Sequence, residues 1–211
     1  MIIAVDGPTA SGKGTIARAL AAHFGLPHLD TGLLYRAVGR QVVLNGGNPD
    51  DPADAEAACA FPDLLLADPA LRSEETGGLA SRVSIHPGVR RSLYERQRSF
   101  ATQSGGAVLD GRDIGTVIAP EAQVKLFVTA SVEVRAMRRC LEMQDRGEEV
   151  TMEEIAADLR ERDERDRNRA AAPLAAANDA FLLDTSEMDR DEAVSAAIRI
   201  VNELTGQLPC P

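Results

Sequence analysis

The sequence is poor in the residues from which disulfide networks, zinc sites and membrane spans are built. It has three cysteines, at positions 59, 140 and 210, that form no C-x-x-C pair, and three histidines without metal-ligand spacing. This pattern indicates reduced thiols and excludes a disulfide framework or a metal held by protein nitrogen or sulfur. No apolar run approaches the ~20 residues of a membrane span, and the apolar segment before Asp6 is too short for a signal-peptide core. We expect a soluble cytoplasmic protein with no membrane partner.

Lysine is scarce as well. The 23 basic residues include only Lys13 and Lys125, which leaves 21 arginines against 33 acidic residues and a formal net charge of −10. This balance argues against a nucleic-acid partner, which would require a broad basic face. At 211 residues and 44% hydrophobic composition, the chain suffices for one domain with its own core. Arginines gathered in a cleft can still make it locally positive.

Apolar runs and helical periodicity alternate along the chain. Runs typical of buried strands occupy residues 2–5, 107–109, 124–128 and 181–183, with a further short strand that ends at Asp30. Helical spacing of apolar residues covers residues 13–24, 33–44, 89–102, 132–146, 152–169 and 191–204. This alternation predicts an α/β fold with a central parallel five-stranded sheet flanked by helices. Ligands bind beyond the carboxyl ends of such strands, where Asp6, Asp110 and Asp184 are expected.

The strongest motif lies between the first strand and the first helix. It reads Gly7-Pro8-Thr9-Ala10-Ser11-Gly12-Lys13-Gly14-Thr15, which is G-x-x-x-x-G-K followed by Gly-Thr. Glycines let backbone N–H groups turn toward a phosphate chain, the helix N-terminus adds its positive dipole end, and Lys13 can reach the outer phosphates. The motif therefore predicts the phosphate-binding loop of a nucleoside-triphosphate enzyme.

A dinucleotide-binding fingerprint is the alternative interpretation, because Gly12-x-Gly14-x-x-Ala17 is followed at a suitable distance by Asp30. That fingerprint starts where the strand ends, whereas Gly12 lies well beyond Val5, and it has no need of a lysine. Thr15 stands one place later than the usual magnesium-binding hydroxyl, so we expect Mg²⁺ to be held mainly by nucleotide phosphates and water. No Asn-Lys-x-Asp motif for guanine is present, which favours ATP-using small-molecule kinases.

Phosphoryl transfer between two polyanions requires positive charge around the transferred group, and arginine forks supply it. Four segments carry suitable arginines: residues 30–36, 110–116, 135–139 and 160–169. Taken alone, the alternating charges of the last segment are better explained as a solvated helix face. However, Arg162, Asp166 and Arg169 share one face, which a kinase lid needs in order to close over phosphates. Ser81 and Arg90 carry no local signal of their own.

Together these segments resemble the bacterial cytidylate kinases, the monophosphate kinases for CMP and dCMP. The resemblance spans nearly the whole chain and rests on residues 3–8 with 11–15, 29–36, 110–116 and 161–173. Its most specific strings are Asp-Gly-Arg-Asp at 110–113 and Arg-Asp-Arg-Asn-Arg at 165–169. It implies a P-loop kinase fold, with a core of residues 1–30, 103–135 and 170–211, a small NMP-binding lobe at about 31–102 and a helical lid at about 136–169.

The resemblance also implies which residues bind ATP and catalyse. Residues Gly7 to Thr15 would hold the ATP phosphates, with Lys13 on the transferred group, and Arg138 and Arg139 would cover them from the lid. Catalysis would depend on Lys13, Arg112, Arg162 and Arg169.

The CMP site follows in the same way. The CMP phosphate would bind Arg36, Arg112 and Arg169, and the sugar would contact Arg162 and Asp166. Ser81, Arg90 and Asp113 would read cytosine, because its amino group suits a carboxylate and its ring acceptors suit arginine, whereas uracil would turn a carbonyl toward Asp113. The remaining substrate-binding residues would be Thr31 and Tyr35.

One region departs from the family pattern. Residues 45–87 are dense in Pro, Asp, Gly and Ala and are expected to form a small lobe outside the sheet, but residues 61–72 are too few for the β-rich insert that family members commonly carry. This shortening bears on lobe closure and on the choice between CMP and dCMP. The expected activity is Mg²⁺-dependent transfer from ATP to CMP or dCMP by a monomer. Another small-molecule P-loop kinase and a non-catalytic ATP-binding module are the alternatives.

Overall fold

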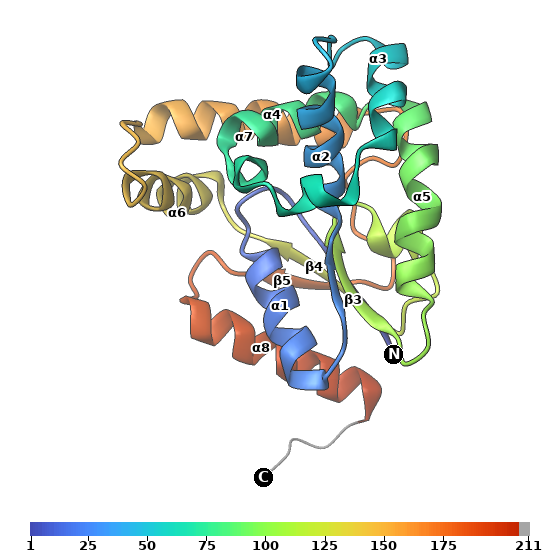
Figure 1. Ribbon diagram of the computed structural model, residues 1–211. Helices are drawn as coiled ribbons and strands as arrows, with labels where there is room; N and C mark the ends of the chain where they lie inside the picture. The colour runs from blue at the N-terminus through green and yellow to red at the C-terminus, as the bar shows by residue number, and fades with distance from the viewer. Residues whose placement is uncertain (207–211) are drawn as a thin grey trace.

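The computed structural model describes residues 1–206. Within that range the chain folds around one five-stranded parallel sheet with strand order β2-β3-β1-β4-β5, and helices cover both of its faces (Figure 1). The α/β architecture and the five strands are therefore confirmed. The strands are Ile2–Asp6 (β1), His28–Asp30 (β2), Ala107–Gly111 (β3), Val124–Thr129 (β4) and Phe181–Asp184 (β5).

The six predicted helices are also present, with ends that shift by a few residues. The α-helices are Lys13–Phe24 (α1), Thr31–Leu44 (α2), Pro52–Ala57 (α3), Glu74–Val83 (α4), Pro87–Ala101 (α5), Val132–Gln144 (α6), Met152–Asn168 (α7) and Arg190–Thr205 (α8). Neither α3 nor α4 was predicted. Both begin at polar caps, since Asp51 and Ser73 accept hydrogen bonds from the first backbone amides of the two helices. None of the described helices has the length and apolar character required to cross a membrane.

Strand β1 shows how the sheet is buried on both faces. Its alternate residues Ile3 and Val5 belong to an apolar cluster shared with α1 and α8. Ile2 and Ala4 face the other side and belong to a second cluster with residues of β3 and of a one-turn π-helix, Ile114–Ile118. Because successive side chains of a strand point to opposite faces, the apolar residues 2–5 bury both faces of this central strand, and its last residue, Asp6, leads into the phosphate-loop motif.

Helices α2 to α4 and the first half of α5 form a separate cluster beyond the carboxyl edge of the sheet, while the second half of α5 packs beside β3 (Figure 1). Residues 45–87 contribute no strand to the sheet, and residues 61–72 fold mainly as two short 3₁₀ turns, Asp63–Ala67 and Pro69–Arg72. Helices α2 and α4 approach closely because a Cβ on Gly39 would lie 2.7 Å from the Cβ of Leu79. On the other side of the same edge, α6 and α7 pack through a small apolar cluster of their own.

Candidate active site

A cavity of about 780 Å³ lies at the carboxyl edge of the sheet, between the loop before α1, helices α2, α4 and α5, and the α6–α7 pair. Asp110 lines it, whereas Asp184 is exposed and accepts hydrogen bonds from Ser186 instead. The structure brings together in this cavity most of the residues predicted to form the site. Those that line it are residues 9–15, Thr31, Tyr35, Arg36, Ser81, Arg90, Arg112, Asp113, Arg138, Arg139, Arg162, Asp166 and Arg169.

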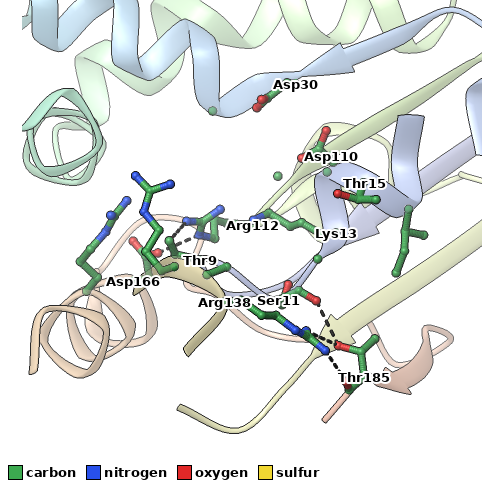
Figure 2. Close-up of a pocket in the computed structure, with 18 of the residues that line it drawn as sticks. Thr9, Ser11, Lys13, Thr15, Asp30, Asp110, Arg112, Arg138, Asp166 and Thr185 are labelled. Atoms are coloured by element: carbon green, nitrogen blue, oxygen red, sulfur yellow. Dashed lines mark hydrogen bonds and ion pairs between the residues drawn. The ribbon is translucent and has the colours of Figure 1, made fainter. Parts of the chain in front are cut away.

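The phosphate-loop motif connects β1 to α1, as predicted (Figure 2). Gly7 and Gly12 take φ angles of +153° and +87°, and a Cβ on Gly7 would lie 2.0 Å from the carbonyl oxygen of Val128, so glycine is required there. Lys13 Nζ donates a hydrogen bond to the Pro8 carbonyl at 3.2 Å. Burial, and then the nearby charge of Arg112, lowers the pKa of Lys13 to about 7. Within residues 1–206 the bond to Pro8 is the one hydrogen bond that the ammonium donates, and a phosphate chain would supply further acceptors and favour the charged form.

Arg112 links this loop to α7. Its Nε donates to Asp166 Oδ2 at 2.8 Å and its Nη2 donates to Thr9 Oγ1 at 2.5 Å (Figure 2). Burial opposes the charge of Asp166, but the guanidinium groups of Arg112, Arg169 and Arg162 outweigh it and lower the pKa of this carboxyl. Arg112 is therefore held between the loop and the opposite wall of the cavity, with its planar fork in one orientation.

A second cationic group lies where α2, α4 and α7 meet. Arg36 donates to the carbonyls of Leu71 and Ser73, at 2.9 and 2.7 Å, and Arg162 donates to the Gly77 carbonyl at 3.2 Å. A Cβ on Gly77 would lie 2.9 Å from Arg36 Nη2 and 3.3 Å from Arg162 Nη1, so the absent side chain makes room for both guanidiniums. Burial and the neighbouring charge of Arg162 lower the pKa of Arg36 to about 10.

Glu74 partly balances this group. It accepts from Arg162 Nη1 at 2.6 Å and from Arg139 Nε at 2.8 Å. Arg139 thus points toward α4, while Arg138 points toward the loop after β5, where it donates to the hydroxyl and the carbonyl of Thr185 at 3.0 and 2.7 Å (Figure 2). The two neighbouring arginines, predicted to act together, therefore line different walls of one cavity.

Asp113 forms the third part of the site. It is buried, it pairs with Arg90, and Arg169 Nη2 lies 3.7 Å from it. The Arg90 guanidinium also lies 5.7 Å from the centroid of the Tyr35 ring, within cation–π range. Ser81 accepts a hydrogen bond from Arg165 at 2.8 Å. A carboxylate, an arginine and a hydroxyl thus surround one end of the cavity, which is a suitable set for the polar edge of a base.

Two guanidinium nitrogens in the cavity walls are buried and lack a hydrogen-bond acceptor in the part of the chain that the structure describes. Arg162 Nε and Arg169 Nη2 have no hydrogen-bond partner among residues 1–206. Burial lowers the pKa of both residues. A buried donor without a partner costs free energy, so these nitrogens favour an anionic ligand that brings acceptors with it.

The comparison with protein families bears directly on this cavity. The model of the family described as cytidylate kinase matches residues 3–203, which includes every residue of the site. The chain belongs to the cytidylate kinase family. It is similar to proteins named cytidylate kinase from Xanthobacter autotrophicus, with 60% identity over 95% of this chain and 97% of the relative, and from a Caulobacter species, with 56% identity over 95% and 93%. A solved structure of an uncharacterized protein from Eubacterium ventriosum shares the fold, with a TM-score of 0.58 and 16% identity over 98% of both chains.

Several residues of this cytidylate kinase family member were missed by the sequence reasoning. Glu74 has no motif around it, and its pairing with Arg139 and Arg162 depends on helices far apart in the sequence. Arg135 was among the candidate arginines, but it is buried and forms a bidentate ion pair with Asp163. It also donates a hydrogen bond to the Thr9 carbonyl. Arg165 lies within the most specific string, although nothing there indicates its bond to Ser81.

Proposed function

We propose that this chain transfers the γ-phosphoryl group of ATP to CMP and dCMP, forming CDP and dCDP. Membership of the cytidylate kinase family and the names of its relatives support this. The observation that carries it is one cavity with two anion-binding ends, the Lys13 loop and the Arg36–Arg162 group, and with Arg112 held between them. The Asp113 end would take the cytosine base.

In the proposed reaction the CMP phosphate attacks the γ-phosphoryl group in line. This phosphate is already largely ionised at neutral pH, so no strong general base is needed, and positioning with electrostatic stabilisation carries the catalysis. Lys13, Arg112, Arg162 and Arg169 would stabilise the charge on the transferred group. Arg36 would hold the acceptor phosphate, and Asp166 would hold the sugar.

The proposal divides the chain as the family resemblance implies. Residues 31–102, which contain α2 to α5, would be the NMP-binding lobe, and residues 136–169, with most of α6 and all of α7, the lid. Residues 1–30, 103–135 and 170–206 would be the core, and residues 207–211, also expected there, lie outside the described residues. The bonds from Arg162 and Arg139 to Glu74 already join lid to lobe, so closure would replace or rearrange these contacts around the nucleotides.

Magnesium fits the side of the cavity next to the loop. Asp30 and Asp110 are neighbours in the sheet register, and burial together with the charge of Asp110 raises the pKa of Asp30. Two close carboxylates favour a cation or its bound water. We propose that Thr15, Asp30 and Asp110 would help to hold a Mg²⁺ ion that arrives with the nucleotide phosphates. The ion supplies charge neutralisation on the phosphates, and the protein supplies their orientation.

A single assay of ADP release tests this function, with CMP, dCMP, UMP, AMP and GMP as acceptors, with and without Mg²⁺. We expect Mg²⁺-dependent turnover with CMP and dCMP well above that with the other three. Turnover of another acceptor with CMP ignored would support a different small-molecule kinase. Binding of ATP with no turnover of any acceptor would support a non-catalytic module. We further propose that the active form is a cytoplasmic monomer, which size-exclusion chromatography of the active fraction would check for oligomeric state.

Replacement of Asp113 should weaken base discrimination. In Asp113→Ala the amino group of cytosine loses its acceptor while the carbonyl of uracil loses a repulsive partner, so we expect the preference for CMP over UMP to fall about 10- to 100-fold. The measurement is the ratio of kcat/KM for the two acceptors. Asp50→Ala is the control, because that carboxylate pairs with Arg82 on the surface and should leave the ratio unchanged. An unchanged ratio in Asp113→Ala would refute the base-reading role.

A further inference from the structure

Asp6 is a buried carboxylate outside the cavity lining, at the end of β1 and directly before the phosphate loop. It is 5% exposed. Its Oδ1 accepts a hydrogen bond from the backbone amide of Ile114, and its Oδ2 accepts one from the amide of Gly115, both at 2.8 Å. These two amides open the π-helical turn that begins immediately after Asp113. One side chain thus joins the strand that leads into the ATP loop to the segment that carries Arg112 and Asp113.

The turn depends on this carboxylate. The first amides of any helical turn have no partner within the turn, and here later amides, those of Val117 and Ile118, return to the Asp113 carbonyl at 2.9 and 3.2 Å. Asp6 accepts hydrogen bonds from the first two amides of the turn, those of Ile114 and Gly115, although it lies more than a hundred residues earlier in the sequence. The start of the turn is therefore fixed in two ways: Asp6 binds the amides of Ile114 and Gly115, and the Asp113 carbonyl accepts from Val117 and Ile118.

A buried carboxylate is costly to retain for stability alone. Burial, helped by repulsion from Asp113, raises the pKa of Asp6 to about 7. The two amide hydrogen bonds and the charge of Lys13 act in the opposite direction and lower it. Packing is tight as well, because a Cβ on Gly115 would lie 3.2 Å from Lys125 Cδ and 3.4 Å from Asp6 Oδ2. Well-packed apolar residues often serve stability as well as a buried charge does, so the carboxylate is better explained by the geometry that it imposes.

We propose that Asp6 is a positioning residue that fixes Arg112 and Asp113 relative to the ATP loop, and so sets the affinity for the acceptor and the discrimination between cytosine and uracil. It acts through the amides of Ile114 and Gly115. Because Arg112 bonds to Thr9 of the loop as well, Asp6 and Arg112 make two separate connections between the ATP loop and the base-reading segment. This inference rests on the proposed function of the site.

Asp6→Asn tests the role with little change of shape. Its NH₂ group would face one of the two amide donors, so at most one of the two hydrogen bonds survives. Loss of a bond to a buried amide weakens the hold on the turn, so we expect KM for CMP to rise about 10-fold and the CMP/UMP ratio of kcat/KM to fall about 10-fold. KM for ATP should change much less. A role in folding alone would lower kcat or the melting temperature and leave KM and the ratio unchanged.

The matched control is Asp51→Asn. Asp51 also accepts hydrogen bonds from two backbone amides, those of Ala53 and Asp54 at 2.8 and 3.2 Å, but at the exposed start of α3. Both bonds go to Oδ1, which asparagine retains as its amide oxygen, so this variant should leave stability, KM and the CMP/UMP ratio nearly unchanged. Equal shifts in the kinetics of both variants would overturn the inference.

Two further variants decide the outcome even where Asp6→Asn does not fold. Gly115→Ala keeps the charge of Asp6, but its Cβ would lie 3.4 Å from Asp6 Oδ2 and 3.2 Å from Lys125 Cδ. The crowded carboxylate should shift against its two amide donors, so KM for CMP and the ratio should change in the same direction, about threefold. In an Asp113→Ala background, Gly115→Ala should cause no additional loss of discrimination, because both act through the position of one carboxylate.

The results separate the two proposals. Wild-type turnover of CMP with insensitive Asp6→Asn and Gly115→Ala variants would overturn the positioning role alone. Additive losses of discrimination in the double variant would do the same. A wild-type chain that does not turn over CMP would overturn the proposed function and this inference together.

Discussion

Lys13→Ala is expected to reduce turnover about a thousandfold and to leave the fold intact. Lys13 is the first residue of α1, directly after the loop, and within residues 1–206 its ammonium donates one hydrogen bond, of 3.2 Å to the Pro8 carbonyl. The backbone turn is made by glycines that the variant retains. Loss of a preorganised cation next to the transferred group costs on the order of 10²–10³ in rate, and a phosphoryl group with its concentrated charge lies at the upper end. The measurement is kcat with saturating ATP and CMP.

The depressed pKa of Lys13 gives a second readout for the same variant. With a pKa of about 7 in the free protein, much of the lysine is neutral at pH 8. A bound polyphosphate favours the ammonium form and raises this pKa, so binding of ATP at pH 8 should take up protons. Calorimetry in two buffers of different ionisation enthalpy measures the uptake, which should be smaller in Lys13→Ala than in the wild type.

The control for Lys13 is Arg96→Ala, which removes a cation that pairs with an exposed Asp63 on the surface. Its kcat and proton uptake should match those of the wild type. Near-full activity in Lys13→Ala would contradict the assignment of the loop, whatever the proton uptake. An inactive variant with a changed circular dichroism spectrum would instead show that Lys13 supports the fold.

The parts of the site that could be predicted from sequence are those whose functional residues lie next to one another in the chain. The phosphate loop is one contiguous segment, so the spacing of its glycines and Lys13 alone indicates phosphate binding. Strands β1, β3 and β4 were recognisable because they lie inside the parallel sheet and are buried and apolar along nearly their whole length, whereas the edge strands β2 and β5 are more exposed. The pairing of separate segments into one cavity came from the family resemblance, and the structure places those residues around the same space.

The rest could not be predicted because it consists of contacts between distant segments. Helices α3 and α4 start at polar caps and have few apolar residues, so periodicity did not reveal them. Glu74 is one of many glutamates until α4 is placed against α6 and α7. Asp6 was expected only as a residue at the edge of the sheet, and its two bonds to the turn after Asp113 depend on the neighbouring positions of β1 and β3.

Asp163→Ala is expected to have the largest effect on stability. Asp163 and Arg135 are 4% and 2% exposed, and they join α7 to α6 through two hydrogen bonds of 3.1 and 2.6 Å. Removing one partner of a buried pair leaves the other charge uncompensated, which costs about 3–5 kcal/mol. Asp163→Asn should cost less, because the amide oxygen can still accept one bond from Arg135. The free energy of unfolding in urea measures both.

Glu133→Ala is the matched control, since Glu133 on α6 faces Arg160 on α7 across the same two helices. That pair is 71% and 59% exposed with 3.5 Å between the charged atoms, and exposed pairs contribute about 0–1 kcal/mol. Because Arg135 also donates to the carbonyls of Thr9 and Ala130, an Arg135 released from Asp163 would disturb the phosphate loop. The Asp163→Ala variant should therefore also bind ATP more weakly, while Glu133→Ala binds it normally. Equal stability losses in the two variants would show that the buried Arg135–Asp163 pair contributes no more to the free energy of unfolding than the exposed pair does.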